Sequence, residues 1–149
     1  MTQQRERPVR RRFPKRIERA ADGSGVWFDK RLVRWSELRA IGFVTVTNVA
    51  LDELTYAVFQ LTDGTHAWWL VWRDHGGSPM VSSEVDGWLR TLVTPGIELP
   101  EVPCGRVAQY DRGGVLWPAS ELGQDIYEER PHRVLGFLWR EPAMFARLR

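Results

Sequence analysis

The sequence predicts an α+β protein: a strongly bent antiparallel β-sheet capped by a helix, with a smaller C-terminal section that completes the core. Three observations lead to this fold class. Segments rich in β-branched and aromatic residues recur along the first half of the chain. Asp63-Gly64 separates two of them, and this dipeptide favours a tight hairpin turn. A later segment, residues 83–93, carries apolar side chains at helical spacing.

The chain divides by charge into a basic arm and a mildly acidic body. Its 149 residues suit a single domain that can bury a core. Residues 1–19 contain eight basic and two acidic side chains, whereas the remainder contains 13 basic and 17 acidic ones. We therefore expect a flexible or peripheral N-terminal arm over residues 1–19 and one α+β domain over residues 20–149.

The first elements expected in the body are strands. Residues 22–25 (Asp-Gly-Ser-Gly) signal a turn. Residues 25–29 then suit a short strand, residues 30–31 a tight connection, and residues 32–35 the partner strand. Residues 39–47 are rich in β-branched and aromatic residues, so they predict a long strand.

Residues 56–61 and 66–72 both have strand length and flank the expected hairpin turn. In the second strand, Trp68 and Trp69 fall on opposite faces, and both faces are apolar. Such a strand is normally central and covered on both sides. We favour a core role for most of these aromatics over the alternative, an exposed aromatic patch that binds a partner. His66, beside the turn, is expected to be exposed.

Residues 83–93 predict a helix with acidic residues at its beginning and one apolar face. That face consists of Val85, Trp88, Leu89 and Leu92. Further along, residues 106–110 and 113–117 suit short strands, and residues 142–149 suit a terminal helix.

Catalytic, metal-binding and membrane-spanning motifs are not apparent in the sequence. The three histidines have no metal-ligand spacing, and the single cysteine, Cys104, has no neighbour that would activate it. No apolar run is long enough to span a membrane. We therefore expect a cytoplasmic protein that is not an enzyme and uses no metal or other cofactor.

The segment Val33 to Ile41 contains Trp-Ser-Glu-Leu between a short hairpin and a long strand. Together with the hairpin and helix expected after it, this segment resembles the opening of bacterial PH-like domains in small uncharacterised bacterial proteins. The resemblance covers about residues 22–94 and a C-terminal Phe-Leu-Trp-Arg segment at 137–140. It implies a PH-like binding scaffold without catalytic residues, and some proteins of this kind are thought to be immunity or adaptor proteins.

Three functions follow as hypotheses, the third being an enzyme with an unfamiliar site near Asp74 and His75. The first is a protein-binding module, such as an immunity or adaptor protein that blocks a protein partner, for example a toxin, by steric and electrostatic contact. Its contact residues are expected to be Asp52, Glu53, Trp69, Trp117, Glu128 and Glu129. The alternative is a protein that binds nucleic-acid phosphates through its arm. The residues expected to do so are Arg10, Arg11, Arg12, Lys15 and Arg16.

Overall fold

The computed structural model describes residues 10–47, 53–74, 83–101, 113–124 and 126. Eight strands, one α-helix and two short 3₁₀ turns lie in these ranges. In chain order they are β1 (Arg10–Arg12), β2 (Ile17–Arg19), β3 (Gly25–Phe28), β4 (Arg31–Arg34), η1 (Trp35–Glu37), β5 (Leu38–Thr47), β6 (Glu53–Leu61), β7 (Thr65–Asp74), α1 (Ser83–Val93), β8 (Gly113–Trp117) and η2 (Ala119–Glu121).

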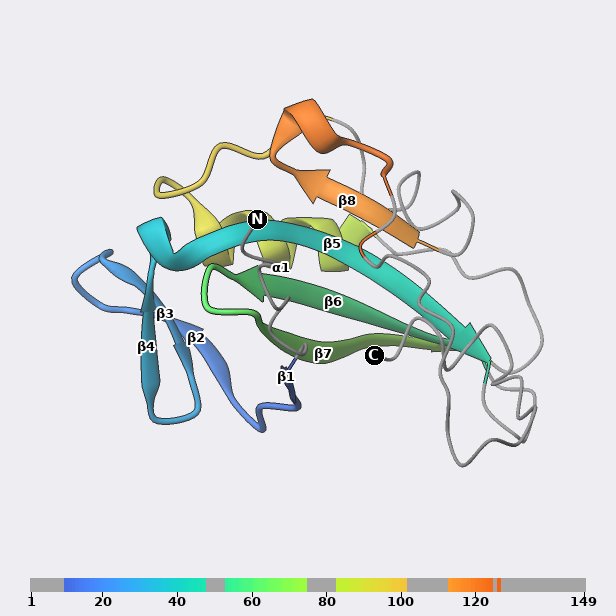
Figure 1. The fold of residues 1–149 in the computed structure, drawn as a ribbon, viewed down its shortest axis with the longest axis horizontal. Coiled ribbons are helices and arrows are strands. Elements are labelled where there is room, and N and C mark those ends of the chain that lie inside the picture. Colours follow the sequence, from blue (N-terminus) through green and yellow to red (C-terminus); the bar gives the residue numbers. More distant parts are fainter. Residues whose placement is uncertain (1–9, 48–52, 75–82, 102–112, 125, 127–149) are drawn as a thin grey trace, which may run out of the picture.

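The described strands form two sheets (Figure 1). A five-stranded sheet has the order β1-β7-β6-β5-β8, and a three-stranded sheet has the order β2-β3-β4. The α+β class and the helix over residues 83–93 are thus confirmed. The prediction of a wholly antiparallel sheet is wrong, because β1 runs parallel to β7 and makes the larger sheet mixed. The described strands do not close into a barrel.

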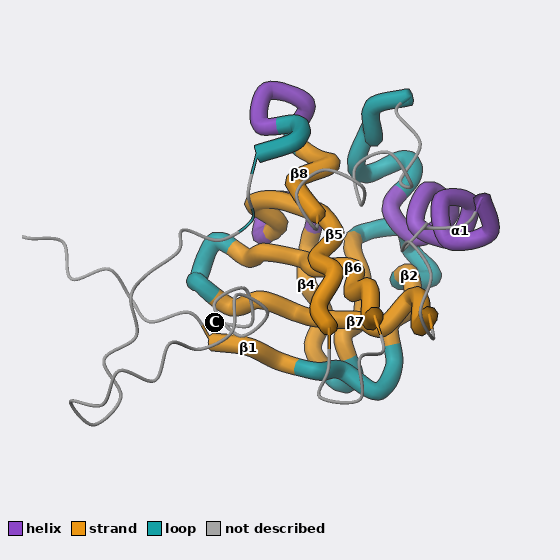
Figure 2. Tube along the Cα trace, turned by 90° about the vertical axis from the view of Figure 1, so that its right-hand side faces the viewer, coloured by secondary structure: helices purple, strands orange, loops and turns teal. Residues whose placement is uncertain are grey.

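The main core lies where the two sheets and α1 meet. It combines Phe43 and Phe59 of the larger sheet, Val26 and Val33 of the smaller sheet, and Leu89 of the helix. Figure 2 shows α1 beside the strands, with β2 next to it. The apolar face predicted for the helix is the one that packs, since its side chains are buried or partly buried in this core.

A second, smaller cluster covers the opposite face of the five-stranded sheet. Val44, Val46, Val58 and Trp68 are buried there, with Tyr56 partly buried against them. Apolar residues therefore occupy both faces of β6 and β7, as the sequence of residues 56–72 predicts.

Two hairpin turns depend on residues that tolerate a positive φ. Gly64 has a φ of 87° and ends the turn between β6 and β7, at the predicted position. The β3–β4 turn lies one residue earlier than expected, at residues 29–30. Asp29 has a φ of 54° there, and aspartate is one of the few residues that reaches this region at small cost.

Residues 10–19 are part of both sheets. Strand β1 adds to the edge of the larger sheet, and β2 pairs antiparallel with β3 in the smaller one. Between these strands, the Asp29 carboxylate accepts the backbone amides of Lys15 and Arg16 at 2.9 and 3.0 Å. The second half of the expected arm is therefore tied to the β3–β4 turn.

Candidate binding surfaces on either side of strand β1

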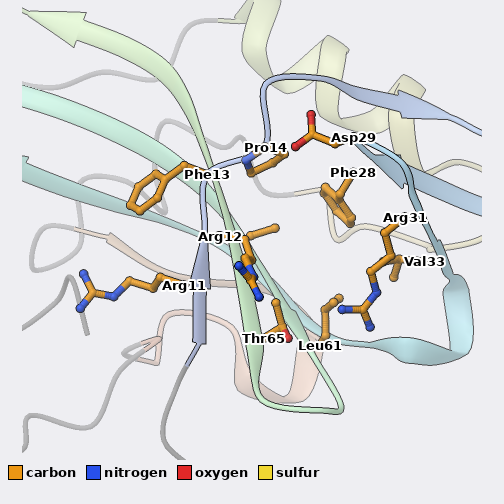
Figure 3. A pocket seen from close by; sticks show the side chains of 11 residues that line it. Arg11, Arg12, Phe13, Pro14, Phe28, Asp29, Arg31, Val33, Leu61 and Thr65 are labelled. Atoms are coloured by element: carbon orange, nitrogen blue, oxygen red, sulfur yellow. The ribbon is translucent and has the colours of Figure 1, made fainter.

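Strand β1 presents its side chains to two different surfaces. Its three arginines pair in parallel register with residues 65–67 of β7. Because side chains alternate along a strand, Arg10 and Arg12 share one side, whereas Arg11 and Phe13 share the other. Arg11, Arg12 and Phe13 all line one pocket, and in Figure 3 the side chains of Arg11 and Phe13 extend to the other side of the strand from Arg12.

Phe13, Tyr56 and Leu70 form one surface, which we call the apolar patch. The Phe13 ring centroid lies 6.3 Å from that of Tyr56 and 6.2 Å from that of Trp68. Tyr56 in turn pairs across the strands with Leu70. The side chains of Phe13 and Leu70 are 57% and 46% exposed, whereas Trp68 is buried. The patch thus has a buried indole as its base and two exposed apolar side chains at its surface.

Positive charge borders the apolar patch. Arg11 lies on the same side of β1 as Phe13, and its partner across the strands is His66, which is buried. Burial lowers the pKa of His66 to about 4, and the nearby Arg11 and Arg39 add to this effect. His66 is consequently neutral at pH 7, and arginine supplies the charge at this border. The expectation that His66 is exposed is wrong, because β1 adds an edge beyond it.

The second surface is a pocket between β1 and the β3–β4 hairpin, with a volume of about 490 Å³. Its lining includes buried apolar side chains, among them those of Phe28, Val33, Leu61 and Ala67. These residues come from both sheets, so the pocket lies where β1, the edge of one sheet, faces β4, the edge of the other (Figure 3). We call it the β1–β4 pocket.

Polar groups of different charge lie at the two ends of the β1–β4 pocket. Figure 3 shows Arg12 and Thr65 toward one end and Asp29 toward the other. The Arg31 guanidinium lies at the same end as Arg12 and Thr65. It is 2.9 Å from the Asp63 carboxylate and 3.9 Å from that of Glu37. The Thr65 amide donates a hydrogen bond to the Asp63 carboxylate. This hydrogen bond and the nearby Arg31 lower the pKa of Asp63 to about 2, so the carboxylate is charged at neutral pH.

The basic residues predicted from the sequence are divided between these surfaces. Arg10 and Arg12 lie on the pocket side of β1, and Arg11 lies on the side of the apolar patch. Lys15 and Arg16 follow in the link to β2, where Arg16 forms an exposed ion pair with Glu18 at 2.9 Å.

Of the residues predicted for a protein contact, only Trp69 and Trp117 have side chains that the structure describes. Trp69 and Trp117 are partly buried and pack against the main core. Glu53 begins β6, and Asp52, Glu128 and Glu129 lie outside the described residues. The expected strand at residues 106–110 and the expected terminal helix also lie outside them.

Sequence reasoning identified none of the three residues of the apolar patch as contact residues. Phe13 is the only aromatic residue of the arm, and in an unpaired arm it has no neighbours with which to form a surface. Leu70 was assigned to a covered strand face. Pairing of β1 with β7 is what joins the two residues, and a three-residue strand of arginine carries no apolar periodicity that could predict it.

The described residues contain neither a metal site nor a membrane-spanning helix. No three His, Cys, Asp or Glu side chains among them are grouped so that they could hold a metal ion. In the same part of the chain, no helix has the length and apolar character needed to cross a membrane.

Comparisons with protein-family models, with curated proteins and with solved structures find no match to this chain. The relationship to bacterial PH-like domains therefore stays a prediction from residues 22–94.

Proposed function

We propose that this protein is a non-catalytic protein-binding module whose contact surface is the apolar patch, and that its partner presents an acidic, partly apolar surface. The observation that carries the proposal is the exposure of Phe13 and Leu70, at 57% and 46%, over a buried aromatic base. Large apolar side chains exposed together are typical of protein-interaction sites.

Arginine beside the patch supports an acidic partner. Arg11 lies on the patch side of β1, and arginine with aromatic residues is enriched at protein interfaces. The described chain is also polarised: residues 10–47 contain ten basic and four acidic side chains, whereas the described residues from 53 onward contain two basic and eight acidic ones. This surplus of positive charge favours encounter with an anionic surface.

The PH-like resemblance supports the same class of function, because those domains are binding scaffolds. We propose the PH-like relationship, the immunity or adaptor role and the cytoplasmic location together with this function. Contact through Asp52, Glu53, Glu128 and Glu129 is the competing arrangement. The apolar patch is preferred because its residues are placed next to one another in the described structure.

A capture experiment with matched variants tests the proposal. The bait proteins are the native chain, a Phe13→Ser/Leu70→Ser double variant, Trp27→Ser and Asp52→Lys/Glu53→Lys. Capture is carried out from lysate with and without nuclease treatment, and the affinity of any captured protein is then measured by calorimetry. Trp27 is the control, because it is also a partly exposed aromatic residue, at 36%, but lies in the three-stranded sheet.

We expect the patch variant to weaken the affinity at least tenfold, and Trp27→Ser to leave it unchanged. Loss confined to the Asp52/Glu53 reversal would assign the contact to the acidic residues instead. Binding that disappears with nuclease would identify a nucleic-acid partner and contradict the proposal. Unfolding curves of each variant separate lost contact from lost fold.

A further inference from the structure

We propose that the β1–β4 pocket binds a small amphipathic anion, that is, a molecule with one carboxylate or phosphate-type group on an apolar body. This site shares Phe13 with the apolar patch as a lining residue but opens on the other side of β1, and it does not depend on the function proposed above (Figure 3).

The size and lining of the pocket suit the apolar body of such a ligand. Its volume of about 490 Å³ falls within the range of about 300–1,000 Å³ typical of small-molecule sites. Phe28, Val33, Leu61 and Ala67 line it and are each at most 8% exposed, so they form an apolar floor fixed by the main core. A ligand body placed against this floor would be removed from water, which stabilises binding in proportion to the apolar area buried.

The cationic end of the pocket suits one anionic group. The Arg12 guanidinium forms no ion pair within the described part of the chain, so its charge is available to a ligand. Arg31 is already shared with Asp63 and Glu37, which neutralises most of its charge. The Thr65 hydroxyl adds one hydrogen-bonding group at the same end.

The opposite end of the pocket disfavours a second negative charge. Asp29 lies there, and its carboxylate already accepts the backbone amides of Lys15 and Arg16. A ligand with anionic groups at both ends would bring one of them toward this carboxylate, which is unfavourable. The pocket thus has one cationic end, an apolar floor and one acidic end, and this order selects a molecule with one anionic group and an apolar tail.

Four probes separate these contributions in NMR titrations of the full chain, followed through the methyl signals of Val33, Leu61 and Ala67. Octanoate and octyl phosphate combine an anion with an apolar body, 1-octanol supplies the body alone, and acetate supplies the anion alone. The key variant is Arg12→Gln. Its matched control is Arg11→Gln, because Arg11 is the preceding residue of β1 and, although it is one of the lining residues, its side chain extends away from that of Arg12 in Figure 3.

We expect saturable binding of octanoate or octyl phosphate at least tenfold tighter than that of octanol or acetate. Arg12→Gln should weaken it at least tenfold and Arg11→Gln by less than twofold. The tighter of the two anionic probes identifies the headgroup as carboxylate or phosphate. The proposal is overturned if neither anionic probe shifts these methyl signals saturably, if octanol binds as tightly as both, or if the two variants weaken binding equally.

Discussion

His66 illustrates how one added strand changes the chemistry of a single residue. Its position beside a hairpin turn predicts exposure, yet β1 places Arg11 next to it and leaves the side chain only 7% exposed. Burial lowers its pKa from 6.5 to about 4, with Arg11 and Arg39 contributing. In the folded protein the neutral imidazole is therefore the favoured form.

This shift predicts a loss of stability in mild acid. Between pH 6.5 and about pH 4 the unfolded chain binds a proton at His66 that the folded chain does not, so the free energy of unfolding falls as the pH is lowered. A shift of this size corresponds to about 3 kcal/mol at full extent. Above pH 6.5 this contribution is complete, and below pH 4 it changes no further.

Urea unfolding at pH 7.5, 5.5 and 4.5 measures the effect, with His66→Gln as the comparison. The glutamine variant is expected to lose less stability than the native chain between pH 7.5 and 4.5. The titration of Asp63 does not affect this comparison. Its pKa is lowered to about 2, so its contribution to the free energy of unfolding is lost only below pH 4. Equal pH dependence in the two proteins would show that His66 titrates normally.

At the scale of elements, helix α1 offers a test of local propensity. Gly87 lies inside the helix, is exposed, and has no heavy atom within 4 Å of the position where a Cβ would be built. Alanine has a higher helix propensity than glycine by about 1 kcal/mol. We therefore expect Gly87→Ala to raise the free energy of unfolding by about 0.5–1 kcal/mol in urea unfolding experiments.

Gly96→Ala is the matched control, three residues after the helix. A Cβ at Gly96 would overlap the Trp35 indole, whose nitrogen donates to the Gly23 carbonyl at 2.7 Å. This variant is expected to be less stable than the native chain, because either the indole or the loop must move. A higher free energy of unfolding for Gly96→Ala, or a lower one for Gly87→Ala, would contradict the packing described around α1.

The elements that the sequence predicts well are those with a repeated apolar pattern. Helix α1 and strands β5 to β8 carry such a pattern, and their positions agree with prediction to within a few residues. Strands β1 and β2 do not, since each is three residues long and rich in arginine or glutamate. Their order is imposed by pairing with β7 and β3, a tertiary effect that local patterns do not encode.

The same limit explains which parts of the candidate surfaces were predictable. The sequence identifies Arg11 and Arg12 as a basic cluster but cannot show that they serve opposite sides of one strand. It identifies the aromatic concentration at residues 56–72 as mostly core, and Trp68 and Trp69 do pack inward. What remains exposed depends on Phe13, which reaches Tyr56 only because β1 lies along β7.

At the scale of the whole molecule, the N-terminal segment joins the two sheets. Strand β1 contributes three paired positions to the larger sheet and β2 contributes three to the smaller one. Pro14 and Ala20 are buried, and Phe13 lies against Trp68. Deleting residues 1–19 therefore removes an edge strand from each sheet and uncovers apolar surface, in addition to removing eight basic side chains.

We expect the 20–149 chain to be far less stable than the full chain. At roughly 1 kcal/mol per backbone hydrogen bond, the lost pairing alone amounts to about 5 kcal/mol, comparable with the whole stability of many small domains. The 10–149 chain is the control, since the described pairing begins at Arg10. Urea unfolding followed by tryptophan fluorescence compares the three proteins. Equal stability of the 20–149 chain would mean that residues 10–19 are a peripheral arm. The expected result means instead that arm deletion cannot separate binding from folding, so the roles of Arg11 and Arg12 must be measured with single substitutions.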